Sequence, residues 1–269
     1  MKDYHMHTPF GDGRSSIDAM AKTAKELGLE EIAFTEHLSW LFVQLKSGGT
    51  DALTIMPEDI EQYYKECKAA EDKHNIRVLK GFEIGYLERD RENLKKFISK
   101  VKPDLVLVGV HQLDLKQDWT TLGGVEKKAG HSVYLGEDNF KEIIRQHGGF
   151  RKVCERYFQR LNHGINAGFE NYCQMVGVCH LNMFRREPQY NPIIADPFID
   201  KTLELIAEKN LALEINHHYK NQEPRPSYEA AKSFINKGGK KIWFGSNSHS
   251  IESLRESSKH YENFQQLLN

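Results

Sequence analysis

The chain has only four cysteines in 269 residues, and no two of them form a Cys-x-x-Cys pair. This scarcity argues against a disulfide framework or a thiolate metal site. The N-terminal segment MKDYHMHTPF lacks the apolar run of a secretory signal, and no stretch reaches the ~18 consecutive apolar residues that a membrane span needs. We therefore expect a cytoplasmic protein with reduced thiols and no membrane segment.

An excess of either charge is also missing, because 37 Lys and Arg residues nearly cancel 38 Asp and Glu residues. Proteins that bind nucleic acid or an anionic membrane usually have a basic excess. A small molecule is thus the expected partner. Internal repeats and low-complexity tracts are absent as well, and a chain of this length can bury a sizeable core. One globular domain over residues 1–269 is expected.

Short apolar runs alternate with helical patterns along the whole chain. The runs predict strands at residues 3–6, 31–35, 77–84, 105–110, 175–179, 211–215 and 241–244. Apolar faces predict helices at residues 16–27, 57–70, 94–101, 137–146, 151–168, 198–209 and 228–236, and from 251 onward. Residues 39–55 and 114–136 are expected to be loop insertions. Seven β-then-α units imply parallel strands with right-handed crossovers, in a barrel or a doubly wound sheet.

Metal-binding side chains recur where these strands end, and both architectures place ligands at that edge. The first strand ends in His5-x-His7, the second in Glu36-His37, and the third carries Glu83. Later strand ends carry His111, His180, Glu214 and His249. A single histidine near a strand end is more often a hydrogen-bonded residue than a ligand. Six that converge at one face are a far stronger signal.

Imidazole and carboxylate ligands without thiolates favour zinc, iron or manganese. Asp12 adds a carboxylate close to the first histidine pair. Together these side chains exceed what one ion needs, so two or three divalent ions are expected, with Glu83 as the bridging ligand. The other seven histidines, at positions 74, 131, 147, 163, 217, 218 and 260, fall in predicted helices and loops. We expect no ligand role for them.

These segments resemble the PHP (polymerase and histidinol phosphatase) family, and most closely its stand-alone histidinol-phosphate phosphatases. The similarity covers nearly the whole chain and rests on DYHMHTPFGDG, FTEH, GFEIGY, VGVH, CHLNMF, LEIN and GSNSH, in the family's order. It implies a distorted (β/α)7 barrel with a trinuclear site. The implied metal ligands are His5, His7, Asp12, His37, Glu83, His111, His180, Asn247 and His249.

One position departs from the family's last motif, which usually reads Gly-Ser-Asp-x-His. This chain has Asn247, whose amide can ligate weakly but carries no charge and accepts no proton at neutral pH. Metal affinity, catalysis or both are expected to suffer. Natural divergence and a substitution introduced to reduce turnover both fit the sequence.

The resemblance implies hydrolysis of L-histidinol phosphate to L-histidinol and phosphate, in histidine biosynthesis, by a bridging water that the ions activate. The leaving oxygen would take its proton from the residue at position 247 or from a metal-linked histidine such as His249. Arginine is the natural extra ligand for phosphate, and Arg156, Arg160 and Arg185 are the candidates. Trp40, Phe42 and Tyr219 could contribute to an aromatic substrate pocket.

Two other functions stay open at this point. A different phosphoesterase of the same family would act on nucleotides or nucleic acid, although the balanced charge disfavours a nucleic-acid groove. A homologue weakened by Asn247 would bind metal without efficient catalysis. The metal, the oligomeric state and the residues that recognise the organic part of the substrate are not encoded in recognisable motifs.

Overall fold

The computed structural model describes residues 1–38, 54–120, 126–127, 130, 132–135, 137–185, 187–218 and 223–268. Its main sheet has seven parallel strands in the order β1-β2-β3-β4-β9-β10-β11. They are β1 (Lys2–Met6), β2 (Glu31–Leu38), β3 (Arg77–Gly85), β4 (Leu105–Gly109), β9 (Met175–Val178), β10 (Ala212–Asn216) and β11 (Lys241–Gly245). Each coincides with a predicted strand.

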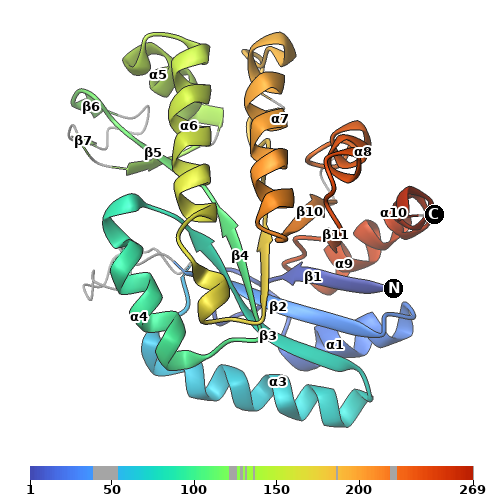
Figure 1. Cartoon of the computed structure of the whole chain (residues 1–269). Helices are drawn as coiled ribbons and strands as arrows, with labels where there is room; N and C mark the ends of the chain where they lie inside the picture. Colours follow the sequence, from blue (N-terminus) through green and yellow to red (C-terminus); the bar gives the residue numbers. More distant parts are fainter. Residues whose placement is uncertain are drawn as a thin grey trace.

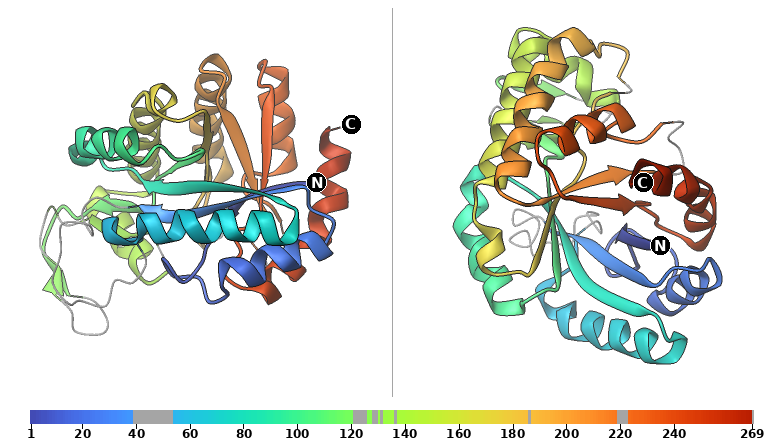
Figure 2. Two further views of the ribbon diagram at one scale, coloured as in Figure 1. Left: turned by 90° about the horizontal axis from the view of Figure 1, so that it is seen from below. Right: turned by 45° about the vertical axis from the view of Figure 1, so that its right-hand side comes forward.

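The sheet curls into a nearly closed barrel, so the doubly wound alternative was wrong. A parallel bridge joins Met6 to Ser248 beyond the last strand, and the His7 amide donates to the Ser248 carbonyl over 2.9 Å. The two ends of the sheet therefore meet at the carboxyl edge of β1. Figures 1 and 2 show the helices arranged around the outside of the strands.

The helices follow the predicted units closely. They are α1 (Ile17–Glu26), α3 (Ile60–His74), α4 (Arg91–Val101), α5 (Glu137–His147), α6 (Phe150–Ile165), α7 (Pro192–Glu208), α8 (Tyr228–Asn236), α9 (Ile251–Ser257) and α10 (Tyr261–Leu268), with 3-10 turns η1 (Pro57–Asp59), η2 (Glu88–Asp90), η3 (Phe169–Asn171) and η4 (Ser258–His260). Ser16 caps α1 by accepting from the Ala19 amide. The apolar face of α1, which includes Met20 and Ala24, is fully buried against the sheet.

Two predictions need correction. The insertion at residues 114–136 was expected to be loop, but β5 (Gln112–Asp114) pairs with β8 (Ser132–Tyr134) and β6 (Trp119–Thr120) pairs with β7 (Glu126–Lys127), all antiparallel. Strands of two or three residues are too short to show an alternating pattern. Helix α7 begins at Pro192 rather than after Pro197, because proline suits the first helical position and the later Pro197 removes only one hydrogen bond.

A layer of apolar side chains fills the barrel interior, mostly toward the amino ends of the strands, with Cys179 reaching Glu83. It consists of Tyr4, Ala33, Leu79, Leu105, Leu107 and Cys179, with Met175 and Trp243 packed against them. Gly177 makes room for the indole, since a Cβ there would lie 2.5 Å from a Trp243 ring carbon. This layer closes one end of the barrel, so the polar side chains that face inward lie at the other end. All four cysteines are free and buried.

Candidate metal centre

Six histidines and two carboxylates meet inside the barrel at the carboxyl ends of its strands. They are His5 in β1 and His7 after it, Asp12 in the following loop, His37 in β2, Glu83 in β3, His111 after β4, His180 after β9 and His249 after β11. Asn247 lines the cavity beside them. All nine residues predicted as ligands are therefore brought together, as parallel strands require. Their role in holding metal stays a prediction.

Glu83 is the centre of this cluster and is completely buried. Its Oε2 atom lies 2.9 Å from Nδ1 of His37, 3.2 Å from Nε2 of His5 and 3.5 Å from Nε2 of His7. Its Oε1 atom lies 2.9 Å from Nε2 of His111 and 2.8 Å from Nε2 of His180. Each carboxylate oxygen thus faces a different set of imidazoles, which is the arrangement of a bridging ligand.

The electrostatics of the cluster follow from burial and from this crowding. Burial alone would raise the pKa of Glu83, but the surrounding imidazoles of His5, His37, His111 and His180 hold that pKa well below its usual range. Burial and three neighbouring histidines lower the pKa of His7 well below its usual value. His7 is therefore neutral at pH 7, which is the form that binds metal.

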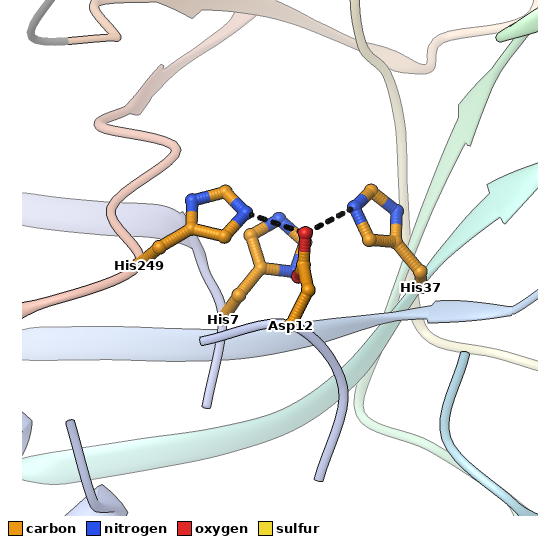
Figure 3. Close-up of side chains that lie close together, drawn as sticks. All are labelled: His7, Asp12, His37 and His249. Atoms are coloured by element: carbon orange, nitrogen blue, oxygen red, sulfur yellow. Dashed lines mark ion pairs between the residues drawn. The ribbon is translucent and has the colours of Figure 1, made fainter. Parts of the chain in front are cut away.

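Asp12 organises a second group of ligands at the outer side of the cluster. Figure 3 shows its carboxylate between His37 and His249, with His7 behind it. The Oδ2 atom of Asp12 lies 3.2 Å from Nε2 of His249 and 3.9 Å from Nε2 of His37. The His7 ring stacks on those of His37 and His249, with 4.4 Å between ring centroids in both pairs. Four potential ligand atoms therefore lie within 4.8 Å of one another here.

The residues present fit more than one divalent ion. Three sets of side chains place their ligand atoms within 4.8 Å of one another, namely His7/Asp12/His37/His249, His5/Glu83/His180 and His37/Glu83/His111. His37 and Glu83 each belong to two sets; the two oxygens of Glu83 could serve neighbouring ions, whereas the neutral His37 imidazole would serve one. Among the residues that the structure describes, Nδ1 of His7, Oδ1 of Asp12 and Oδ1 of Asn247 are buried without a hydrogen-bond partner. Metal ligation would satisfy these atoms.

Glu214 of β10 has a role that the sequence analysis did not assign, although it noted an acid at this strand end. Its Oε1 atom accepts a hydrogen bond from Nδ1 of His5. This bond fixes which nitrogen of His5 is left for a metal. Gly245 allows the contact, because a Cβ there would lie 2.1 Å from Glu214 Oε1 and 2.9 Å from the His5 Cβ. The glycine of the last motif is therefore required by packing.

Asn247 occupies a backbone conformation that few residues adopt, with φ at 49°. Asn and Asp tolerate this left-handed region better than most side chains do. Its carbonyl oxygen accepts a hydrogen bond of 3.0 Å from Nδ1 of His249. The backbone of Asn247 therefore orients the His249 ring, while Asn247 itself lines the cavity.

A cavity of about 250 Å³ opens above the cluster. Its lining combines ligand candidates with apolar and neutral polar side chains: Asp12, His37, Leu38, Thr54, Glu83, Gly85, Tyr86, Leu87, His111, Gln112, His180, His218, Asn247 and His249. His218 was expected to have no role in the site, but the structure places it in this lining. Strand alternation was the available signal, since Glu214, Asn216 and His218 share one face of β10 and its extension.

Arg160 is one of three arginines proposed from the sequence as phosphate ligands, and its guanidinium is engaged elsewhere. Its side chain is 1% exposed on α6. Nε donates to Glu88 over 2.9 Å, Nη1 to the Gln112 carbonyl over 2.8 Å and Nη2 to Asp114 over 2.6 Å. These bonds join α6 to η2 and β5. Arg160 therefore holds in place the backbone of Gln112, a residue that lines the cavity.

The other two arginines also have acidic partners. Arg156, one helical turn before Arg160, lies 2.8 Å from Glu88, and Arg185 lies 2.5 Å from Glu223. None of the three belongs to the described lining of the cavity. The sequence-based prediction that they bind phosphate therefore receives no support from their positions. The physical reason is that each arginine forms an ion pair with a carboxylate that lies close in space but far away in the sequence, namely Glu88 or Glu223.

Two further expectations concern the pocket aromatics and membrane segments. Trp40, Phe42 and Tyr219, named as pocket aromatics, lie outside the described residues. In the part of the chain that the structure describes, no helix has the length and apolar character to cross a membrane.

Comparison with known proteins adds to this geometry. The family model of the PHP domain matches residues 3–218. This chain belongs to the PHP domain family. The match ends before β11, so it does not include Asn247 and His249, which follow that strand and lie in the cluster described above.

Three relatives indicate where in the PHP family the chain lies. A histidinol-phosphatase of Lactococcus lactis is 26% identical over 257 residues, which are 92% of this chain and 83% of the relative. The structure of a Listeria monocytogenes protein, described as a candidate histidinol phosphatase, superposes with a TM-score of 0.77 at 18% identity, covering 97% of this chain and 100% of the other. The structure of a Lactococcus lactis histidinol phosphate phosphatase, solved with zinc, L-histidinol and phosphate, superposes with a TM-score of 0.64 at 22% identity. The match covers 96% of this chain and 92% of the other. The structural matches establish the fold.

Proposed function

We propose that this protein is a metal-dependent phosphomonoesterase that hydrolyses L-histidinol phosphate to L-histidinol and phosphate. The observation that carries the proposal is the Glu83 carboxylate, whose two oxygens face five histidine nitrogens within 3.5 Å at one end of a small cavity. Such a cluster is built to hold several cations close together. The Lactococcus relative with the same activity in its name matches most of this chain.

The ions would be held by the three sets of side chains that share His37 and Glu83, with Asn247 as an additional weak ligand. Zinc, iron and manganese all suit imidazole with carboxylate, and zinc is present in the Lactococcus structure. When bound, such ions neutralise the charge of phosphoryl oxygens and make a water molecule a better nucleophile.

The protein's own side chains supply orientation and exclude competing reactions. Glu214 holds the His5 ring in one tautomer, and the Asn247 carbonyl does the same for His249. Beneath the cluster, a layer of apolar side chains fills the barrel interior. Catalysis therefore depends on groups fixed before the substrate arrives.

The cavity suits a small organic phosphate. Leu38, Tyr86 and Leu87 form an apolar wall, and Thr54 and Gln112 offer neutral hydrogen-bonding groups. Its described lining contains no Lys or Arg, whereas a groove for nucleic acid would contact several phosphates through such residues. We therefore include in the proposal a small-molecule partner, no nucleic-acid partner, a single domain over residues 1–269 and a cytoplasmic location.

Phosphate release tests the assignment. Purified protein is analysed for metal content, loaded with zinc, iron or manganese in separate samples, and given L-histidinol phosphate, a nucleotide panel or an oligonucleotide. The expected result is release from L-histidinol phosphate that is lost after chelation and restored by metal. A Glu83→Gln variant serves as the metal-site control, with Glu204→Gln, an exposed change on α7, as its match.

Each contrary outcome selects a different function. Release only from nucleotides or nucleic acid would replace the substrate but keep the phosphoesterase chemistry. No release with any metal, in both the native chain and the Asn247→Asp variant, would identify a metal-binding homologue without catalysis.

A further inference from the structure

His218 lies in the cavity although it belongs to none of the three metal-ligand sets. It follows β10 on the face that points into the barrel. Glu214, Asn216 and His218 form a column on this face, because side chains two residues apart in a strand share a side. The column runs from the hydrogen bond with His5 to the lining of the cavity.

The backbone that carries His218 is anchored on both sides. The His217 amide donates to the Gly245 carbonyl over 2.7 Å, and the His217 ring stacks on Phe244 at 4.8 Å between centroids. The His218 amide donates to Oδ1 of Asn216 over 3.2 Å, and Nδ2 of Asn216 donates to Glu214 over 3.2 Å. The site for the His218 side chain is thus set by the same network that orients His5.

Asn247 and the other histidines that line the cavity are poorly suited to deliver a proton. Asn247 cannot act as an acid, because its side chain is an amide. The two nitrogens of His249 face the Asn247 carbonyl and Asp12. Nε2 of His111 and Nε2 of His180 both face Glu83. His218 is the histidine in the described lining that lies outside the ligand cluster.

We propose that His218 is the proton donor to the leaving oxygen of the substrate. The proposal rests on the proposed function, because it needs a phosphomonoester in the cavity. In the step, the water oxygen forms a bond to phosphorus and gives up one proton to solvent, while the bond from phosphorus to the alkyl oxygen breaks. The alkyl oxygen takes the proton of the His218 imidazolium, and the imidazole regains a proton from solvent. The products are an alcohol and inorganic phosphate.

A comparison of leaving groups tests this role. An alkoxide leaves poorly unless it is protonated, whereas p-nitrophenolate leaves readily without a proton. For His218→Gln we expect kcat on L-histidinol phosphate to fall by roughly a hundredfold or more, the usual scale of general acid catalysis, and kcat on p-nitrophenyl phosphate to fall by less than about tenfold. His163→Gln, a half-exposed position on α6, is the matched control and should change neither rate.

Two measurements that do not depend on turnover complete the test. Metal content of His218→Gln should equal that of the native protein, and the Kd for inorganic phosphate, measured by calorimetry on the metal-loaded protein, should stay within about threefold. Loss of metal would make His218 a ligand, and a much weaker Kd would make it a phosphate-binding group. Either result overturns the proposal, as does an equal loss of kcat on both esters.

Failure of the proposed substrate can be told apart from failure of this role. If the native protein hydrolyses other alkyl phosphates but not L-histidinol phosphate, the same alkyl-to-aryl comparison is made on them, and the expected result is unchanged. If the native protein hydrolyses no phosphomonoester with any metal, both the proposed function and the role of His218 are wrong.

Discussion

Nδ1 of His5 donates a hydrogen bond to Glu214, and Nε2 of the same ring lies 3.2 Å from Glu83. One imidazole thus connects a carboxylate outside the ligand cluster to the carboxylate at its centre. Burial would lower the pKa of His5, but the charges of Glu214 and Glu83 raise it well above its usual value. The apo cluster therefore holds a proton on His5 that a metal would displace from the side facing Glu83.

Weakening this connection is expected to weaken metal binding. Glu214→Gln removes the negative charge that keeps the His5 ring oriented, and changes of this kind cost roughly 10- to 100-fold in metal affinity or activity. Metal content after dialysis and the phosphatase rate at fixed metal concentration measure the loss. Glu204→Gln on α7 is the matched surface control. Unchanged affinity would show that Glu214 has only a packing role.

Asn247→Asp should raise both metal affinity and turnover. The change is nearly isosteric, and aspartate tolerates the same left-handed backbone at φ 49°. It adds a negative charge among the imidazoles and a group that can exchange a proton, so a gain of about tenfold or more in kcat is expected. Asn166→Asp, on the exposed end of α6, is the control for added charge alone. A rate equal to or below that of the native chain would contradict the prediction.

Arg160→Met should destabilise the fold without altering phosphate recognition. The substitution removes three hydrogen bonds of a buried guanidinium, while Arg156 still pairs with both Glu88 and Asp114, so a loss of about 1–3 kcal/mol is expected. Denaturant unfolding measures that loss, and KM for the phosphate ester is measured on the protein that remains folded. A large rise in KM with little loss of stability would restore Arg160 as a phosphate ligand.

His217 should make the protein less stable in acid. Burial lowers its pKa from 6.5 to about 3, with a smaller contribution from His260. At a pH between these two pKa values, the His217 side chain is protonated in the unfolded chain but not in the folded one. The stability that the neutral His217 contributes is therefore fully present above pH 6.5 and is lost as the pH falls toward 3. At pH 5 the expected loss is about 2 kcal/mol.

The His217→Phe variant isolates this effect. Phenylalanine keeps the stacking on Phe244 but cannot take up a proton, so the fall in stability between pH 8 and pH 5 should shrink by that amount. Urea unfolding at the two pH values, in the presence of a chelator, separates it from metal release. His163→Phe on α6 is the control, and equal pH dependence in native and variant protein would contradict the assignment.

Most of the fold was predictable because its signals are local. All seven strands of the sheet were found to within a few residues, since buried parallel strands are continuous apolar runs. The short strands β5 to β8 were missed, because two or three residues carry no period. The start of α7 was missed because the buried positions Ala195 and Ile199 stabilise a helix across Pro197, and that packing is not visible locally.

The gathering of the candidate metal ligands was predictable for a different reason. Parallel βα units send every strand in one direction, so a residue type that recurs at strand ends must gather at one face, and His5, His111 and His180 did so. Pairing between side chains follows no such rule. Arg160 meets Glu88 and Asp114 across separations of 72 and 46 residues, and His218 faces the cavity only because β10 continues its alternation past Asn216.

The amino-acid sequence by itself determined the order of elements, the edge of the sheet where histidines and carboxylates gather, and which of these side chains gather there. Those properties depend on the spacing of apolar residues and on the direction of the strands. Both follow from residues that are close together in the sequence. Tertiary structure alone decided which carboxylate orients His5, which arginines are already paired and which histidine outside the ligand cluster reaches the cavity. Each of these depends on distances of a few ångströms between segments that only the closed barrel brings into contact.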